Sequence, residues 1–328
     1  MTALPDAALS RLVRALRTPD LSETRYLLGR EVGRGGMGSV WEADDPELGR
    51  SVALKVLDLP DSAGDLSARL RREARVLARL EHPGVVPVHD VGTLPDGRPW
   101  YAMKLVRGER LDAAAARLST LPERLRLFLR VCEPVAFAHA RGVVHRDLKP
   151  SNVMVGPFGE VLVLDWGIAR LLEEEASEGR PGPPAAPPTE PREPRAAAAP
   201  GTAAGTVLGT PGYMAPEQAR GDGDVDGRAD VFALGVLLRE LAGPEALRAR
   251  RLAAIVAKAT AERPAERYGG APALAADVVR YLDGEPVTAY RERPWERAAR
   301  FAVRHRVALL LVLAYLAARA AILVLYRR

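Results

Sequence analysis

The glycines Gly33, Gly35 and Gly38 constrain the fold of this chain more than any other feature. Their G-x-G-x-x-G spacing also occurs in dinucleotide-binding proteins, where a helix follows the glycines at once. Here two strand-like segments, Val40–Ala43 and Val52–Val56, follow around a polar turn. Because glycine has no side chain, a glycine-rich hairpin lets backbone amides approach phosphate groups closely. The pattern therefore favours a hairpin that covers phosphates over a dinucleotide-binding turn.

Lys55 ends the second of these segments in a V-A-x-K pattern. A lysine that points inward from a strand is costly to bury without a negative partner. The helix predicted over Leu66–Leu80 supplies Glu73, which lies beside an inward apolar stripe. We therefore expect an ion pair between Lys55 and Glu73; the alternative is a solvated pair at the surface.

A second group of polar residues lies in the run His-Arg-Asp-Leu-Lys-Pro-Ser-Asn at residues 145–152. Asp147 is suited to accept the proton of an attacking hydroxyl, and Lys149 to neutralise charge on a phosphoryl group. Asn152 is suited to hold a metal ion. Asp165 follows an apolar predicted strand, where a carboxylate can coordinate metal next to phosphates.

These motifs, with the segment Gly-Thr-Pro-Gly-Tyr-Met-Ala-Pro-Glu at residues 209–217, follow one another in a fixed order. In that order they resemble a eukaryotic-like bacterial serine/threonine protein kinase, over roughly residues 26–282. The resemblance implies an α+β, bilobal protein-kinase-like fold. The small β-rich N-lobe, with one helix, would occupy about residues 26–105, and the larger helical C-lobe about residues 106–283.

The resemblance also implies ATP and Mg²⁺ as cofactors. Asp147 is then the catalytic base, Lys149 neutralises charge on the γ-phosphate, and Asn152 and Asp165 hold the metal. The implied ATP-binding residues are Val32, Gly33, Gly35, Gly38, Val40, Ala53, Lys55, Glu73, Met103, Lys104, Val106 and Met154.

Within this set, four residues are implied to sandwich the adenine: Val32, Val40, Ala53 and Met154. Met103 is the implied gatekeeper, and the Lys104 carbonyl and Val106 amide would bond the adenine edge. Four further residues are implied to be structural: Thr210, Glu217, Asp230 and Arg267. Of these, Asp230 would anchor the catalytic loop, Arg267 would pair with Glu217, and Thr210 resembles the serine/threonine-specific subtype.

Residues 173–205 are rich in proline, alanine and glycine, which predicts a disordered insertion in the activation segment. Arg146 resembles the arginine that pairs with a phosphorylated activation segment, for which Thr206 is the first candidate phosphosite and Thr202 the second. The stretch Ala242–Arg251 is shorter than in the family, which usually carries a further substrate-docking helix there.

The C-terminal region predicts attachment to a membrane. Val307–Tyr326 contains one charged residue, Arg319, and as a helix spans roughly 30 Å, about one hydrocarbon core. Residues 284–306 form a basic juxtamembrane linker, and this positive excess places the N-terminal side in the cytoplasm. We expect a single-pass protein of the cell inner membrane with a cytoplasmic kinase domain and an N-terminal extension over residues 1–25; the alternative is a buried C-terminal helix.

The expected activity is transfer of the ATP γ-phosphoryl group to serine and threonine hydroxyls of protein substrates. The chain itself is an expected substrate, with a homodimer for autophosphorylation in trans. The alternative is a pseudokinase scaffold that binds partners at the membrane, although Lys55, Asp147 and Asp165, which pseudokinases typically lose, are present. A small-molecule phosphotransferase is disfavoured by residues 209–217, which such enzymes generally lack.

Net charge and cysteine content add two exclusions. The net charge is +5, but no nucleic-acid-binding motif accompanies it, so we expect no nucleic-acid partner. Cys132 is the single cysteine, which excludes an intrachain disulfide and indicates a reducing, cytosolic setting for the folded part.

Overall fold

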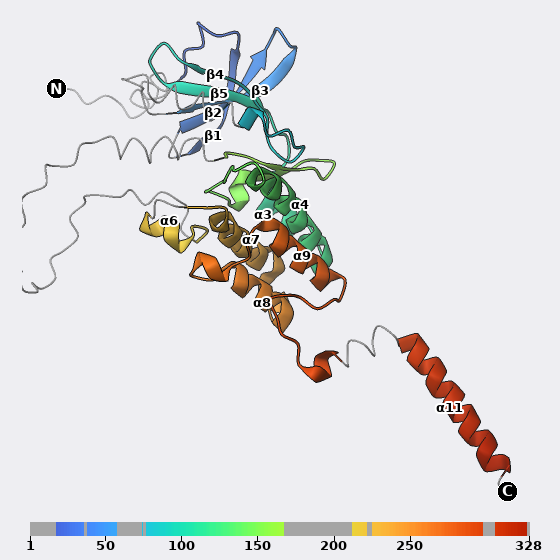
Figure 1. Cartoon of the computed structure of the whole chain (residues 1–328). Coiled ribbons are helices and arrows are strands. Elements are labelled where there is room, and N and C mark those ends of the chain that lie inside the picture. The colour runs from blue at the N-terminus through green and yellow to red at the C-terminus, as the bar shows by residue number, and fades with distance from the viewer. Residues whose placement is uncertain are drawn as a thin grey trace, which may run out of the picture.

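A five-stranded antiparallel sheet forms a small N-terminal lobe, and a group of helices forms a larger C-terminal lobe (Figure 1). This computed structural model describes residues 18–35, 38–57, 74, 77–166, 212–221, 225–297 and 306–326. The expected bilobal α+β arrangement, with a β-rich N-lobe and a helical C-lobe, is confirmed.

The N-lobe sheet has the strand order β1-β2-β3-β5-β4. Its strands are β1 (Leu27–Gly35), β2 (Gly38–Asp45), β3 (Arg50–Leu57), β4 (Val88–Thr93) and β5 (Pro99–Lys104). β2 and β3 are longer than the two predicted segments, because backbone pairing continues from Gly38 opposite Leu57 to Asp45 opposite Arg50. The glycines therefore lead into strands, as predicted, and not into a helix.

The side chains of β3 are divided between two hydrophobic clusters. Leu54 and Val56 enter a cluster confined to the N-lobe, whereas Ala53 and Leu57 enter the large cluster that continues into the C-lobe. Successive side chains of a strand point to opposite faces. Lys55 therefore faces the same side as Ala53 and Leu57, which is the side of the C-lobe.

The C-lobe consists of six helices, two 3₁₀ turns and a three-stranded sheet among the described residues. The helices are α3 (Leu111–Ala116), α4 (Leu121–His139), α6 (Pro216–Arg220), α7 (Arg228–Ala246), α8 (Arg250–Ala259) and α9 (Ala271–Leu282). The turns are η1 (Pro150–Asn152) and η2 (Pro264–Glu266), and the strands are β6 (Glu109–Arg110), β7 (Val153–Val155) and β8 (Val161–Val163). The catalytic run at residues 145–152 thus lies between α4 and β7.

Local sequence signals explain where these helices begin and bend. Thr120 and Glu123 form a capping box at the start of α4, in which each side chain bonds the backbone amide of the other residue. α7 bends at Gly243, whose φ of +77° favours glycine, and Pro244 follows. Only Leu247–Ala249 separate α7 from α8, so the stretch after Leu241 is short, as predicted.

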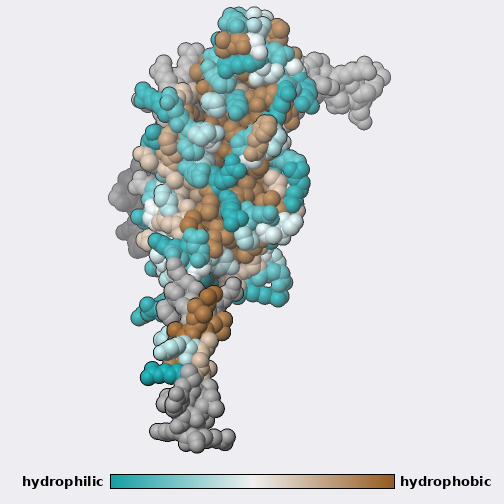
Figure 2. Space-filling model, turned by 90° about the vertical axis from the view of Figure 1, so that its right-hand side faces the viewer, coloured by the Kyte–Doolittle hydropathy of each residue, from teal (hydrophilic) through white to brown (hydrophobic). Residues whose placement is uncertain are grey.

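The C-terminal helix α11 (Arg306–Tyr326) lies apart from the C-lobe in Figure 1. Its described side chains, Val307 and residues 309–319, are exposed, which contradicts the alternative of a buried helix. Figure 2 shows that the surface of this part is largely hydrophobic. Within the described parts of the chain, no helix is both long and apolar enough to cross a membrane. The transmembrane segment therefore stays a prediction.

Several predicted features lie outside the described residues. They are the insertion at residues 173–205, Thr202, Thr206, Thr210, Glu73, most of the helix predicted over Leu66–Leu80, and residues 1–17 of the N-terminal extension.

Candidate active site

Asp230, near the start of α7, is buried and holds the backbone of the catalytic run. Its Oδ2 accepts the amide of His145 at 2.7 Å, and its Oδ1 accepts the amide of Arg146 at 2.8 Å. His139 Nε2 lies 2.7 Å from Oδ2. Arg146 has a φ of +65°, which residues other than glycine rarely adopt. The two hydrogen bonds from the backbone amides to Asp230 therefore offset the cost of a strained backbone. This geometry gives the anchoring role implied for Asp230 a physical basis.

The carboxylate of Asp147 lies at the centre of the catalytic run. Lys149 Nζ is 2.8 Å from Asp147 Oδ2, and Asn152 Nδ2 donates to the same oxygen at 3.2 Å and to the Asp147 backbone carbonyl at 2.8 Å. The three residues are therefore brought together as the sequence pattern predicts. Because two donors fix one carboxylate oxygen, the carboxylate has a defined orientation.

Lys55 and Asp165 form an ion pair between the lobes, with 2.7 Å between Nζ and Oδ1. The hydroxyl of Tyr101 donates to the same oxygen at 3.3 Å. Tyr101 lies on β5 directly opposite Lys55, which explains how the ring reaches this site. Asp165 has a φ of +52°, so the chain turns sharply as it leaves β8. The expected pair between Lys55 and Glu73 stays a prediction, because Glu73 is not described.

The electrostatics of this pair follow from burial and from mutual attraction. Burial lowers the pKa of Lys55, but the interactions with Tyr101 and Asp165 outweigh burial and raise the pKa above its usual value. Burial likewise raises the pKa of Asp165, but the Lys55 ammonium outweighs it and holds this pKa below its usual value. Burial raises the pKa of Tyr101, so its hydroxyl remains a donor at neutral pH. Lys55 and Asp165 are therefore both charged.

The three glycines of the first motif differ in their surroundings. Gly38 has a φ of +152°, and a Cβ placed there would lie 2.1 Å from the backbone oxygen of Val56, so only glycine fits. A Cβ at Gly33 or Gly35 would meet no atom within 4 Å among the described residues. Gly38 is therefore required by the packing of the hairpin. The open space at Gly33 and Gly35 suits close approach of a ligand.

The residues implied for the adenine pocket lie on five strands, β1, β2, β3, β5 and β7, and on the segment that follows β5. Ala53 and Met103 are buried and face each other across β3 and β5. Val40 and Val106 are partly buried against the same cluster. Met154 lies on β7 and is partly buried, Val32 on β1 is 51% exposed, and the Lys104 side chain is exposed. The hydrogen bonds expected from Lys104 and Val106 to an adenine stay a prediction.

Asn152 and Asp165 offer a donor set that suits Mg²⁺. An amide oxygen and a carboxylate are hard oxygen ligands, and Mg²⁺ in phosphate sites typically uses one or two protein ligands, with phosphates and waters completing the shell. Among the described residues, the contacts of Asp165 with Lys55 and Tyr101 both use Oδ1, which leaves Oδ2 for a cation. The described residues contain no group of three His, Cys, Asp or Glu that could hold a metal. Asn152 and Asp165 therefore fit a Mg²⁺ site in which phosphate oxygens and waters complete the coordination shell.

Trp166, the residue after Asp165, is buried in the hydrophobic core. Its side chain is 3% exposed, and its Nε1 donates to the carbonyl of Val163 at 3.1 Å. The ring lies 4.9 Å from the ring of His145, whose Nε2 is 2.8 Å from the carbonyl of Leu164. His145 thereby links the catalytic run to the strand that carries Asp165.

Glu217 and Arg267 form a buried ion pair below the catalytic run. Arg267 Nη1 and Nη2 donate to the two carboxylate oxygens of Glu217 at 2.5 and 2.7 Å, and both side chains are less than a tenth exposed. Gln218, the next residue, donates to the carbonyl of Arg146 at 2.9 Å. α6 is therefore fixed on one side to the C-lobe and on the other to the catalytic run.

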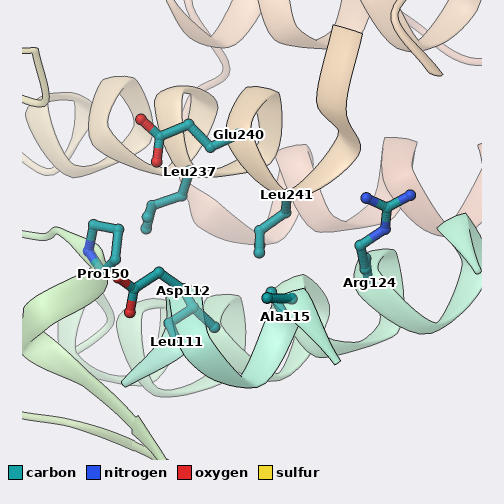
Figure 3. A pocket seen from close by; sticks show the side chains of 9 residues that line it. Leu111, Asp112, Ala115, Arg124, Pro150, Leu237, Glu240 and Leu241 are labelled. Carbon is teal, nitrogen blue, oxygen red and sulfur yellow. The ribbon is translucent and has the colours of Figure 1, made fainter. Parts of the chain in front are cut away.

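A pocket of about 220 Å³ lies beside the catalytic run, between α3 and α7 (Figure 3). Its lining is largely apolar, and it carries carboxylates at one end and a guanidinium at the other. The lining residues are Leu111, Asp112, Ala115, Ala116, Arg124, Pro150, Leu237, Glu240 and Leu241. The hydroxyl of Tyr213 donates to the carboxylate of Glu240. Because Pro150 follows Lys149 directly, the pocket adjoins the catalytic run.

Sequence reasoning missed Tyr101, His139 and Gln218 as parts of the site. The signal for Tyr101 was available, because a β3–β5 pairing that aligns Ala53 with Met103 also aligns Lys55 with Tyr101. His139 and Gln218 gave no local signal, since each acts on backbone or carboxylate groups from a distant segment.

Comparison with known families supports one interpretation of this site. Residues 26–264 match the family model described as "Protein kinase domain". The chain is 34% identical to the serine/threonine-protein kinase PknD of Chlamydia caviae over 304 residues, which cover 80% of this chain and 32% of that protein. It is 40% identical to PknA of Mycobacterium tuberculosis over 220 residues, 65% of this chain and 45% of that protein.

The chain thus spans about a third to a half of the length of the curated relatives that it matches. Among solved structures, the kinase domain of Mycobacterium tuberculosis PknI is similar with a TM-score of 0.57 and 28% identity. That similarity covers 78% of this chain and 96% of the other.

Proposed function

This chain belongs to the protein kinase family, and from that premise we propose that it is a membrane-tethered serine/threonine protein kinase that uses ATP and Mg²⁺. The observation that carries the proposal is the position of the Asp147 carboxylate, within 2.8 Å of Lys149 Nζ and 3.2 Å of Asn152 Nδ2. These side chains belong to one loop, whose backbone Asp230 fixes. A base, a cation and an oxygen ligand for metal are thereby available at one place.

Asp147 is the proposed general base for the attacking hydroxyl. It accepts the proton of a serine or threonine as the hydroxyl oxygen attacks the γ-phosphorus, and the bond to the β–γ bridging oxygen breaks to leave ADP. Lys149 stabilises the charge on the phosphoryl group in transfer. Lys55 holds the α- and β-phosphates, below the hairpin of Gly33 and Gly35. Asn152 and Asp165 would hold Mg²⁺, which would supply neutralisation of phosphate charge.

Protein substrates are proposed to dock in the pocket between α3 and α7. The pocket lies next to Pro150, and Asp112 and Glu240 give one end a negative charge. An apolar side chain with a basic neighbour fits such a lining. The short connection after α7 supports this proposal, because the described chain carries no further helix between α7 and α8 for this role.

Autophosphorylation in trans, within a homodimer, is the proposed activating event. The names of PknD and PknA describe serine/threonine-protein kinases, and the chain carries threonines ahead of Gly209, of which Thr206 and Thr202 are the candidates. Arg146, next to the catalytic aspartate, is the proposed partner of the phosphate.

Attachment to the inner membrane is proposed from the sequence. Val307–Tyr326 is apolar on every face apart from Arg319, and arginines stand on both sides of it. The described side chains of α11 are exposed, which supports the proposal. A large exposed apolar surface is unfavourable in water, and the hydrocarbon of a bilayer would cover it. The kinase domain then lies in the cytoplasm.

The test uses the full chain in lipid nanodiscs, incubated with Mg²⁺ and ATP labelled at the γ-phosphoryl group. We expect label on serine and threonine residues of the chain itself and of an added acceptor protein, and loss of label when EDTA removes Mg²⁺. Nucleotide binding without any transfer would favour the pseudokinase scaffold and overturn the enzymatic assignment. In cell fractionation the full chain should sediment with inner membranes, and a variant that ends at residue 302 should not.

A further inference from the structure

Residues 290–297 follow the last helix of the C-lobe, and both carboxylates of this segment lie near side chains of the C-lobe. Glu292 is almost fully buried, and its Oε1 lies 3.8 Å from Arg251 Nε. Glu296 accepts the hydroxyl of Tyr290 at 3.0 Å and lies 3.8 Å from Arg250 Nη1. Arg250 and Arg251 begin α8, so this helix of the C-lobe supplies a cation near each of the two carboxylates.

The arginines of the same segment face outward. Arg291, Arg293 and Arg297 are exposed, and Trp295 between them is 62% exposed. The guanidinium of Arg293 lies 5.1 Å from the centre of the Trp295 ring. These four exposed residues lie within residues 291–297 and are here called the basic–Trp surface. It combines three exposed guanidinium groups with a single exposed indole.

The exposure of Trp295 sets it apart from the other tryptophans of this chain. Trp41, Trp100 and Trp166 are at most 5% exposed. An indole is amphipathic, and tryptophan is enriched where a protein meets the headgroups of a bilayer. Each arginine near an anionic leaflet adds to the attraction. The chemistry of the basic–Trp surface is therefore that of a lipid interface.

The position of the surface in the chain agrees with this chemistry. Arg300, Arg304 and Arg306 follow it, and the apolar run begins at Val307. The surface therefore leads directly into the segment proposed to enter the bilayer. In Figure 1 it lies at the end of the C-lobe that is farthest from the N-lobe.

We propose that the basic–Trp surface binds the anionic phospholipid headgroups of the membrane, with Trp295 at the interface. This rests on the proposed membrane attachment and adds to it the face of the kinase domain that meets the bilayer. Since the N-lobe lies at the opposite end, the phosphate-binding hairpin faces the cytoplasm and not the bilayer surface. The substrates expected from this arrangement are soluble proteins.

Trp295 supplies its own probe, because it is the one exposed tryptophan of four. The full chain is reconstituted in vesicles of phosphatidylcholine and phosphatidylglycerol with brominated acyl chains, which quench nearby tryptophans. We expect quenching in these vesicles and loss of the quenched component in Trp295→Phe. The combined variant Arg291→Gln, Arg293→Gln and Arg297→Gln keeps the indole but should lower quenching by roughly half or more. Arg117→Gln with Arg248→Gln and Arg263→Gln, at exposed sites elsewhere on the C-lobe, removes the same number of charges as a matched control and should leave quenching unchanged.

Flotation of the same samples separates this inference from the proposed anchor. If the chain floats with the vesicles but Trp295 is not quenched, the anchor stands and the basic–Trp surface does not bind lipid. Equal quenching in vesicles of phosphatidylcholine alone overturns recognition of anionic headgroups. A chain that does not float at all contradicts the anchor, and the inference is then overturned with it.

Discussion

Lys55 Nζ lies 2.7 Å from Asp165 Oδ1, so a cation on β3 of the N-lobe meets a carboxylate that follows β8 of the C-lobe. Each charge is largely removed from solvent and would be costly without the other. Tyr101 adds a hydrogen bond to the same carboxylate oxygen. The pair therefore fixes the distance between the phosphate-binding lysine and the metal-binding carboxylate of the proposed kinase.

Lys55→Met should abolish most of the proposed phosphoryl transfer. The change removes the cation that positions phosphates and leaves the Asp165 carboxylate without its partner. We expect kcat/KM to fall by roughly a hundredfold or more, as for the loss of a fixed electrostatic contact at a reacting group. The matched control is Lys258→Met on α8, outside the site. A Lys55→Met enzyme with full activity would show that the pair has no part in the reaction.

Asp230→Asn should lower both stability and activity. An amide nitrogen cannot accept a backbone N–H, so either the His145 or the Arg146 amide loses its buried acceptor. We expect the free energy of unfolding to fall by about 3 kcal/mol, as for a lost hydrogen bond to a buried charge. Urea denaturation of the wild type and of Asp230→Asn measures this change in the free energy of unfolding. Asp226→Asn, at an exposed position before α7, should change the free energy of unfolding by less than about 0.5 kcal/mol.

The hairpin, the two lobes and the residues of the catalytic run could be predicted from the sequence because their signals are local. Gly38 and the alternation along β3 act within one hairpin, and Asp147, Lys149 and Asn152 belong to one loop. The Lys55–Asp165 pair was not predicted, because it depends on how the two lobes meet. Tyr101 was missed for a related reason, since its role depends on strand register.

The pH dependence of stability should report on Asp277, which is buried on α9. Burial raises the pKa of Asp277, but the amide and hydroxyl of Thr288 and the hydroxyl of Tyr268 outweigh burial and lower it. A lowered pKa gives stability that is complete above the unfolded pKa, about 3.9, and is lost as the pH falls through the folded value.

The comparison of wild type with Asp277→Asn tests this sign. At pH 7 the variant should unfold at a lower urea concentration, with a loss of about 2 kcal/mol. As the pH falls below about 4 the difference should shrink, and the two proteins should converge once the pH is below the lowered pKa of folded Asp277, where the wild-type carboxyl is protonated. Asp283→Asn, at the exposed end of α9, serves as the control. A difference that is the same at pH 7 and pH 3 would contradict the assignment.

Glu240→Gln should weaken the binding of a protein or peptide substrate without affecting ATP. The change removes a negative charge at the end of the pocket near Pro150 and Asp112. For a peptide with a basic residue next to an apolar one, we expect KM to rise roughly tenfold, which corresponds to about 1.4 kcal/mol. KM for ATP should stay constant. Glu245→Gln, exposed near the end of the same helix, is the matched control; equal effects of the two changes would argue against docking in this pocket.

The pocket shows why substrate docking could not be predicted from sequence. The short stretch after Leu241 was recognised, but the surface it leaves depends on the bend of α7 at Gly243 and on the position of α3. The sequence likewise predicted a basic linker over residues 284–306, but not that the arginines around Trp295 are exposed while the Glu292 side chain is buried. Their separation from Glu292 and Glu296 depends on α8, which supplies the partners for both carboxylates.

The central claim is that Asp147 is the base of a phosphoryl-transfer reaction, and Asp147→Asn tests it most directly. The measurement is the single-turnover rate of γ-phosphoryl transfer from ATP to a serine or threonine acceptor, with ATP affinity measured in parallel. We predict that ATP affinity is retained and that the rate falls by roughly 10²–10⁴-fold, the range for loss of a general base. A variant that transfers phosphate at the wild-type rate would contradict the account.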